Sequence, residues 1–141
     1  LLNIKENYLE ALGIEYNPKL IKIAEMIRDY KKKNKVKFIC SDFMNYKFGG
    51  SFDVVFSLAN HSTFDKGITN TQYYFEKIKS IISPNGVLFL EAHSPLYEST
   101  LIFEKLVDDL KRDFSVLNKG VYNFGNFYDT KRVFYILEKN N

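Results

Sequence analysis

Tryptophan is absent from this sequence, and cysteine, proline and glycine are scarce, with one, three and seven residues among 141. A single cysteine, Cys40, cannot form a disulfide within the chain, so we expect a reducing, cytoplasmic setting. No apolar run approaches the roughly 20 residues that a membrane-spanning helix needs. We also expect no signal peptide at the start, Leu1-Leu2. These absences exclude a disulfide-stapled scaffold, and we expect no membrane partner.

Aromatic residues are plentiful, with 13 Phe and 10 Tyr, which suffices for one hydrophobic core. At this length we expect a single domain spanning residues 1–141. The net charge of +3 is small, and most of the excess lies in one lysine cluster: Lys31, Lys32, Lys33, Lys35 and Lys37. A nucleic-acid footprint needs basic residues spread over a face. We therefore interpret the cluster as the solvated end of a helix and expect no nucleic-acid partner.

Strand-like and helix-like stretches alternate along the chain. Short apolar runs predict strands at residues 8–14, 36–40, 52–57, 87–92, 114–122 and 132–137. Helical spacing predicts helices at 18–33, at 69–83 and from Ser99 or Thr100 to Leu110, and residues 1–7 fit the last turns of another. The faces expected to be buried carry Leu20, Ile23, Ala24, Ile27 and Tyr30 in the first helix, and Tyr74, Phe75, Ile78, Ile81 and Ile82 in the second. The 52–57 strand is apolar enough to be buried on both faces. This order predicts a mainly parallel sheet with helices on both faces, closed by an antiparallel hairpin.

Acidic residues stand where the first two predicted strands end. Glu15 follows the first strand and precedes a helix start at Asn17-Pro18, and Asp42 follows the second strand. In open α/β sheets ligands bind outside the carboxyl ends of the strands, where an acidic side chain often accepts hydrogen bonds from a ribose. The polar cluster Asn60-His61-Ser62-Thr63 follows the third strand. We expect all of these side chains at one edge of the sheet.

In this combination the chain resembles the class I S-adenosylmethionine-dependent methyltransferases over nearly its whole length. The stretches that carry the likeness are Gly13-Ile14-Glu15-Tyr16-Asn17-Pro18, Ser41-Asp42-Phe43, Leu58-Ala59-Asn60-His61-Ser62 and Ser83-Pro84-Asn85-Gly86-Val87-Leu88. The likeness implies an α/β, Rossmann-like fold with a C-terminal antiparallel hairpin, and S-adenosylmethionine as the cofactor. The family's first strand and its glycine-rich turn have no counterpart here. We expect them upstream of Leu1, and we expect these 141 residues alone to bind cofactor weakly or not at all.

The resemblance also implies roles for individual residues. Glu15 would hold the ribose hydroxyls and Asp42 would meet the adenine amino group, while Tyr16 and Phe43 would either contact adenine or pack at the rim. Asn60 would face the methionine part of the cofactor. His61 is a candidate general base, because its unperturbed pKa is near neutrality, or else a loop histidine bonded to solvent or backbone. No metal is expected.

We therefore expect in-line transfer of a methyl group to an oxygen, nitrogen or carbon of a small molecule, driven mainly by proximity. Nucleic-acid methyltransferases of the adenine-N6 type carry an Asn- or Asp-Pro-Pro-aromatic segment, which Leu58-Ala59-Asn60-His61 does not match. Cys40, in mid-strand, is no cytosine-type nucleophile. A nicotinamide-dependent oxidoreductase is an alternative that explains Glu15 but not Asp42. A degenerate, non-catalytic methyltransferase-like binding domain is a second alternative.

Overall fold

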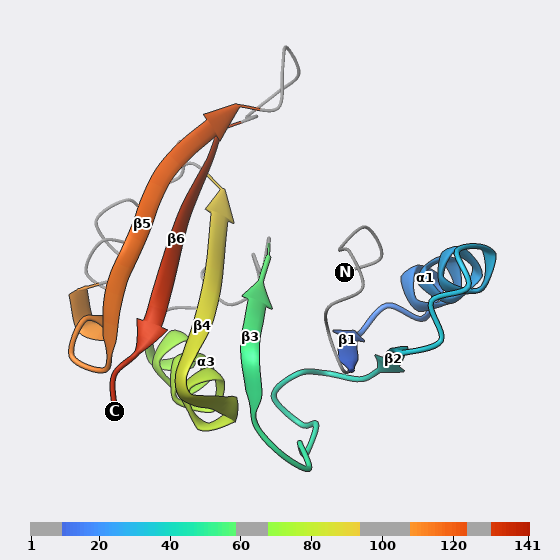
Figure 1. Cartoon of the computed structure of the whole chain (residues 1–141), viewed down its shortest axis with the longest axis horizontal. Coiled ribbons are helices and arrows are strands. Elements are labelled where there is room, and N and C mark those ends of the chain that lie inside the picture. The colour runs from blue at the N-terminus through green and yellow to red at the C-terminus, as the bar shows by residue number, and fades with distance from the viewer. Residues whose placement is uncertain (1–9, 59–67, 94–107, 124–130) are drawn as a thin grey trace. The chain divides into compact units, whose positions relative to one another are not determined.

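The computed structural model describes residues 10–58, 68–93, 108–123 and 131–141 (Figure 1). Contacts between residues divide the chain into two compact units, one ending at Lys47 and the other beginning at Phe48. The helical turns predicted for residues 1–7 lie outside the described residues, and so does the predicted helix start at Ser99 or Thr100.

The N-terminal unit is a strand-helix-strand motif. Strand β1 (Ala11–Glu15) pairs in parallel with β2 (Val36–Cys40), and helix α1 (Pro18–Tyr30) connects them. Helix α1 begins as predicted, because the Asn17 side chain accepts the Lys19 N–H at 3.0 Å and Pro18 occupies the first turn. It ends earlier than predicted, since Lys32 adopts a left-handed backbone with φ of 53°.

The face of α1 that was predicted to be buried is largely exposed. Ile21 and Val36 form the core of this unit, at 8% and 1% exposed, whereas Ile23 and Tyr30 are 52% and 87% exposed. The prediction was wrong because, among the described residues of this unit, the helix has only two five-residue strands to pack on. Those strands approach closely at Gly13, where an added Cβ would lie 2.6 Å from the Phe38 ring.

The C-terminal unit contains a mixed four-stranded sheet in the order β3-β4-β6-β5. Its strands are β3 (Phe52–Ser57), β4 (Ile82–His93), β5 (Phe114–Asn123) and β6 (Lys131–Lys139). Strands β3 and β4 are parallel, while β6 is antiparallel to both β4 and β5. The predicted closing hairpin of β5 and β6 is therefore confirmed.

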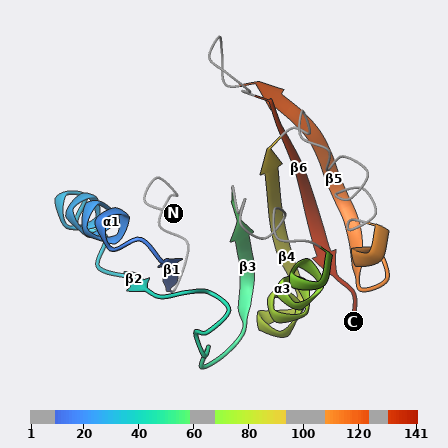
Figure 2. The same cartoon turned by 180° about the vertical axis from the view of Figure 1, so that it is seen from behind.

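Helix α3 (Ile68–Ile81) lies along one face of this sheet, as Figures 1 and 2 show from opposite sides. The core between them consists of helix residues and strand residues that are at most 7% exposed: Tyr74, Phe75, Ile78 and Ile81 with Ile82, Leu88, Leu90, Phe114 and Leu137. Tyr74 and Ser57 are joined by a 2.6 Å hydrogen bond between their hydroxyls. The helical face predicted from the sequence is confirmed.

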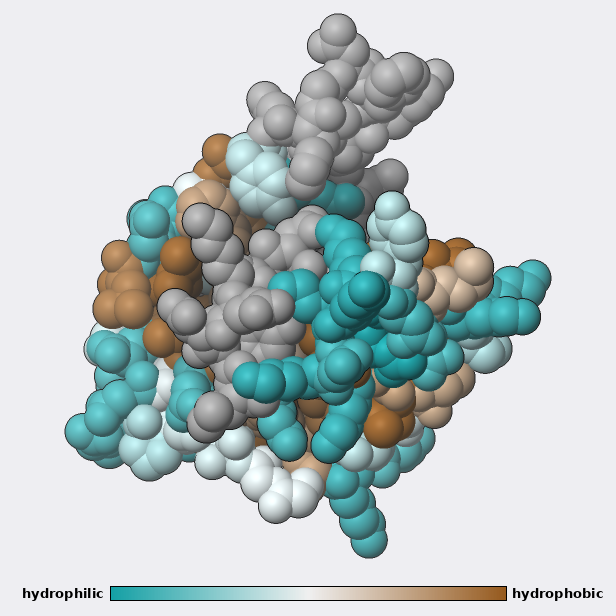
Figure 3. All heavy atoms as spheres, turned by 45° about the vertical axis from the view of Figure 1, so that its right-hand side comes forward, coloured by the Kyte–Doolittle hydropathy of each residue, from teal (hydrophilic) through white to brown (hydrophobic). Residues whose placement is uncertain are grey.

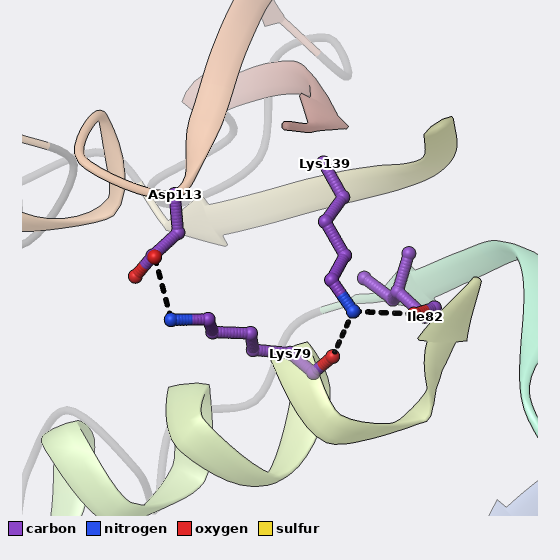
Figure 4. A network of polar contacts seen from close by, with 4 residues as sticks. All are labelled: Lys79, Ile82, Asp113 and Lys139. Carbon is purple, nitrogen blue, oxygen red and sulfur yellow. Dashed lines mark hydrogen bonds and ion pairs between the residues drawn. The ribbon is translucent and has the colours of Figure 1, made fainter. Parts of the chain in front are cut away.

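Two lysines connect the end of α3 to the strands beside it (Figure 4). Lys139 on β6 donates from Nζ to the carbonyl oxygens of Lys79 at 3.0 Å and Ile82 at 2.7 Å. The Lys79 carbonyl lies in the last turn of the helix, where carbonyls have no partner further along it, and Ile82 is the first residue of β4. The Lys79 ammonium in turn pairs with Asp113, just before β5, and this hydrogen bond raises the pKa of Lys79.

Strand β4 begins five residues before the predicted start at Val87. Its pairing with β3 jumps from Phe52 opposite Ile82 to Val54 opposite Val87, so the Ser83-Pro84-Asn85-Gly86 turn is contained within the strand as an irregularity. The turn chemistry is as predicted, because Asn85 has a positive φ of 59°. The predicted start of the strand was wrong because the chain pairs with β3 both before and after the turn.

Strand β3 is not buried on both faces, which corrects the prediction for residues 52–57. Val54 and Phe56 are 51% and 43% exposed. Side chains alternate between the faces of a strand, and Ser57 points to α3, so Phe56 lies on the opposite face. Among the described residues, β3 pairs only with β4 and β1 only with β2, which leaves each with an unpaired edge. Hydrophobic surface is visible between hydrophilic side chains in Figure 3.

Candidate functional site

The two carboxylates singled out in the sequence lie at the same edge of the β1–β2 sheet. Glu15 is the last residue of β1, in register with Cys40, the last residue of β2. The Ser41 N–H donates to the Glu15 carbonyl at 3.1 Å and extends the pairing by one step. Asp42 follows immediately. The strand-helix-strand motif therefore brings both acidic residues to the carboxyl ends of neighbouring parallel strands.

Glu15 is held by the start of the helix that follows it. Its Oε1 accepts the backbone N–H of Asn17 at 2.8 Å in a partly buried position. Among the described residues, its other oxygen, Oε2, has no hydrogen-bond partner. One carboxylate oxygen is thus anchored to the chain, and the other is available to a donor from outside it.

Asp42 organises the turn that leaves β2. Its Oδ1 accepts the Met44 N–H at 2.7 Å, and its Oδ2 accepts from Asn45 Nδ2 at 3.2 Å. Its carbonyl oxygen accepts the N–H groups of Asn45 and Tyr46 at 3.2 and 3.1 Å. A carboxylate offers about four lone-pair sites, so each side-chain oxygen keeps one for a ligand.

The residues around these carboxylates differ in exposure. Tyr16 is 77% exposed and does not pack against the rim, whereas Phe43 is partly buried. Cys40 is exposed at the end of β2 and not in mid-strand as predicted, and its thiol donates to the Tyr16 carbonyl at 3.6 Å. The Tyr16 ring is therefore accessible beside Glu15.

The other predicted site residues, Asn60 and His61, lie outside the described residues. Within the described ranges, no three His, Cys, Asp or Glu side chains gather as metal ligands would. No helix in that part of the chain is both long and apolar enough to cross a membrane.

Sequence reasoning missed two features of the described residues. The first is Asn45, whose signal was an Asp and an Asn spaced as in a side-chain-stabilised turn. The second is a polar cluster in the C-terminal unit, where Arg132 Nε lies 3.6 Å from Glu91 Oε1 and both side chains are under 20% exposed. Burial, and a hydrogen bond to Glu91, raise the pKa of Tyr122 to about 12. The cluster of Glu91, Arg132 and Tyr122 forms only in this register of the strands, and the residue types alone do not reveal the register.

Comparisons with known proteins agree with this geometry. The methyltransferase domain family matches residues 3–141. The N-methyltransferase NodS from Bradyrhizobium japonicum WM9 has a similar structure (TM-score 0.73, 11% identity, 94% of this chain and 74% of that one). So do magnesium protoporphyrin IX methyltransferase from Synechocystis PCC 6803 (0.71, 16%, 93% and 60%) and an rRNA methylase from Streptococcus thermophilus (0.67, 13%, 94% and 74%). The search of curated proteins found no match.

Structural likeness at such low identity establishes the fold, and the family match covers nearly the whole chain. The parallel pairs, the mixed sheet and the closing hairpin fit that fold. The chain therefore belongs to the methyltransferase domain family, and it has the Rossmann-like fold of the class I S-adenosylmethionine-dependent methyltransferases.

Proposed function

We propose that the intact, cytoplasmic protein transfers a methyl group from S-adenosylmethionine to a small-molecule acceptor, with residues 1–141 forming one methyltransferase-like domain. The observation that carries this proposal is the pair of carboxylates, Glu15 and Asp42, at the adjoining carboxyl ends of two parallel strands. Carboxylates only accept hydrogen bonds, and the adenosyl group offers donors in its ribose hydroxyls and its adenine amino group. The residues present therefore fit this cofactor.

Each carboxylate has a distinct part in holding the cofactor. Glu15 is anchored through Oε1, so Oε2 would accept from the ribose hydroxyls. Asp42 would accept from the adenine amino group with the sites left free by Met44 and Asn45. The exposed Tyr16 ring would lie beside the adenine. The structures of NodS with S-adenosylhomocysteine and of magnesium protoporphyrin IX methyltransferase with S-adenosylmethionine support this choice of ligand.

When bound, the cofactor supplies a methyl group on a sulfonium, which is already a strong electrophile. The chain's task is then to orient the two reactants, and such positioning alone lowers a barrier by many kcal/mol. Asn60 would face the methionine portion. His61 would accept the acceptor's proton where that atom carries one. Both residues are assigned these roles from the sequence.

Two features support a small-molecule acceptor over a nucleic acid. The segment after β3 reads Leu58-Ala59-Asn60-His61 and not Asn- or Asp-Pro-Pro-aromatic. The lysine cluster lies at the amino end of β2, with Lys31 and Lys35 before the strand and Lys37 within it. Glu15 and Asp42 lie instead at the carboxyl ends of the strands. Within the N-terminal unit, the basic residues are thus at the opposite edge of the sheet from the proposed cofactor site.

Titration calorimetry of the intact protein tests the choice of cofactor. We expect binding of S-adenosylhomocysteine and no binding of NAD. NAD carries the same adenosine donors, so the expectation follows from the methyltransferase family and from its structural neighbours with bound S-adenosyl ligands. Binding of NAD without S-adenosylhomocysteine would replace this proposal with a nicotinamide-dependent oxidoreductase.

Transfer of label from methyl-labelled S-adenosylmethionine tests the acceptor class. The intact protein is incubated with separate small-molecule, RNA and protein fractions of a cell extract. We expect label in the small-molecule fraction. Label in RNA would contradict the acceptor class, and cofactor binding with no transfer to any fraction would favour the non-catalytic alternative.

A further inference from the structure

The Asp42 carboxylate is fixed by two different donors from the turn that follows it. The Met44 N–H reaches Oδ1 at 2.7 Å, and Asn45 Nδ2 reaches Oδ2 at 3.2 Å. The backbone of the same turn is closed by the N–H groups of Asn45 and Tyr46 on the Asp42 carbonyl. Asn45 therefore contacts Asp42 through both its backbone and its side chain.

The side-chain contact has a consequence that the backbone contact lacks. Rotation about the last side-chain torsion of an aspartate is soft, so a carboxylate held at one oxygen can still turn about that contact. A second donor on the other oxygen fixes the plane of the group. The side chain of Asn45 thus determines where the remaining acceptor sites of Asp42 point.

We propose that Asn45 is a positioning residue that orients Asp42 to accept from the adenine amino group, and so sets the preference for adenine over a 6-oxo purine. This inference rests on the proposed function. Hypoxanthine carries a carbonyl oxygen where adenine carries the amino group, so a fixed carboxylate meets an acceptor there and the contact is repulsive. A carboxylate that is free to turn away discriminates less between the two bases.

The test compares the binding of S-adenosylhomocysteine and S-inosylhomocysteine to the intact protein by calorimetry. Asn45→Ala removes the second donor and leaves the Met44 N–H in place. Without the hydrogen bond that orients Asp42, we expect the affinity for the adenosyl ligand to fall about 3- to 10-fold. Affinity for the inosyl ligand should change less than about twofold. The ratio of the two affinities, which measures the preference for adenine, therefore becomes smaller.

Matched variants separate orientation from folding. Asn45→Asp keeps the shape of the side chain but sets a second carboxylate against Asp42, and it should also narrow the preference. Asn34 is an exposed residue of the same unit, in the turn before β2, and Asn34→Ala and Asn34→Asp should leave both affinities unchanged. The Asn34→Asp control carries the same added charge as Asn45→Asp.

The outcomes distinguish this inference from the function on which it rests. A wild-type preference for the adenosyl ligand that persists in both Asn45 variants contradicts the inference alone, as does an equal loss of affinity for both ligands. A wild-type protein that binds both ligands equally also contradicts it. An intact protein that binds neither ligand contradicts the proposed function and the inference together.

Discussion

Glu15 and Asp42 are both held by a backbone N–H two residues further along the chain, at 2.8 Å from Asn17 and 2.7 Å from Met44. Such local bonds form wherever the following turn forms, so one oxygen of each carboxylate is held in place before any ligand arrives. A binding group that is oriented in advance loses less side-chain freedom when the ligand binds. The local sequence after each strand is therefore part of the proposed site.

A second cluster of polar residues lies on the sheet of the C-terminal unit. Glu91 accepts from the Tyr122 hydroxyl and lies near Arg132, whose Nη1 is buried and has no hydrogen-bond partner among the described residues. Burial and the bond to Glu91 favour the protonated phenol and raise the pKa of Tyr122 to about 12 from its ordinary value of 10. Tyr122 therefore links the stability of this unit to pH.

Because the pKa of Tyr122 is raised in the folded state, the stability of this unit falls at alkaline pH. The folded state holds the phenol proton more tightly than the unfolded state, so the stabilisation is complete below about pH 10 and is lost as the pH rises towards 12. We expect Tyr122→Phe to remove this part of the alkaline loss. Urea unfolding across that pH range measures it, with Tyr73→Phe, at a 65% exposed position, as the control. Equal alkaline slopes for wild type and Tyr122→Phe would refute the linkage.

At the scale of elements, the turn inside β4 depends on a glycine. A Cβ added at Gly86 would lie 2.8 Å from the Ser83 carbonyl oxygen and 3.2 Å from that of Asp53. These are backbone atoms, and they cannot move aside as the end of a side chain can. The close approach of β3 to this turn therefore requires glycine at position 86.

Gly86→Ala should lower the free energy of unfolding by about 1–3 kcal/mol, the usual cost of overpacking. Gly50→Ala is the matched control, because a Cβ there meets nothing within 4 Å. Chemical denaturation of both variants measures the difference. Equal stability of Gly86→Ala and Gly50→Ala would show that the turn relaxes without cost.

Local sequence patterns predicted some features of the helices and strands correctly and missed others. Strands β2 and β3 have the predicted bounds, and α3 buries the predicted face, because periodicity and turn residues are local signals. The start of β4 was not predictable in this way, since pairing across a turn depends on the partner strand. Exposure of Phe56 and of the α1 face depends on which elements cover them, which is a property of the whole fold.

The site was predictable to a similar extent. The position of Glu15 and Asp42 at strand ends follows from the alternation of strands and helices, and the structure brings them to one edge. The donors that hold them, above all Asn45, depend on turn geometry that many sequences share. The Glu91, Arg132 and Tyr122 cluster needs the register of three strands, which no local pattern contains.

At the scale of the whole molecule, the chain combines two parallel pairs of strands with an antiparallel hairpin. Among the described residues, β1 and β3 each keep one unpaired edge, and such edges pair readily with further extended segments. The chain covers 74% of the length of NodS.

In the proposed function Glu15 and Asp42 together hold the adenosyl group, and calorimetric titration of the intact protein with S-adenosylhomocysteine measures whether they do. Glu15→Ala and Asp42→Ala should each weaken binding by about 1–3 kcal/mol, the cost of charge-assisted hydrogen bonds. Glu10→Ala, at the amino end of β1 and 78% exposed, should change it by less than about 0.5 kcal/mol. Wild-type affinity in both the Glu15 and the Asp42 variants would show that these carboxylates do not hold the cofactor.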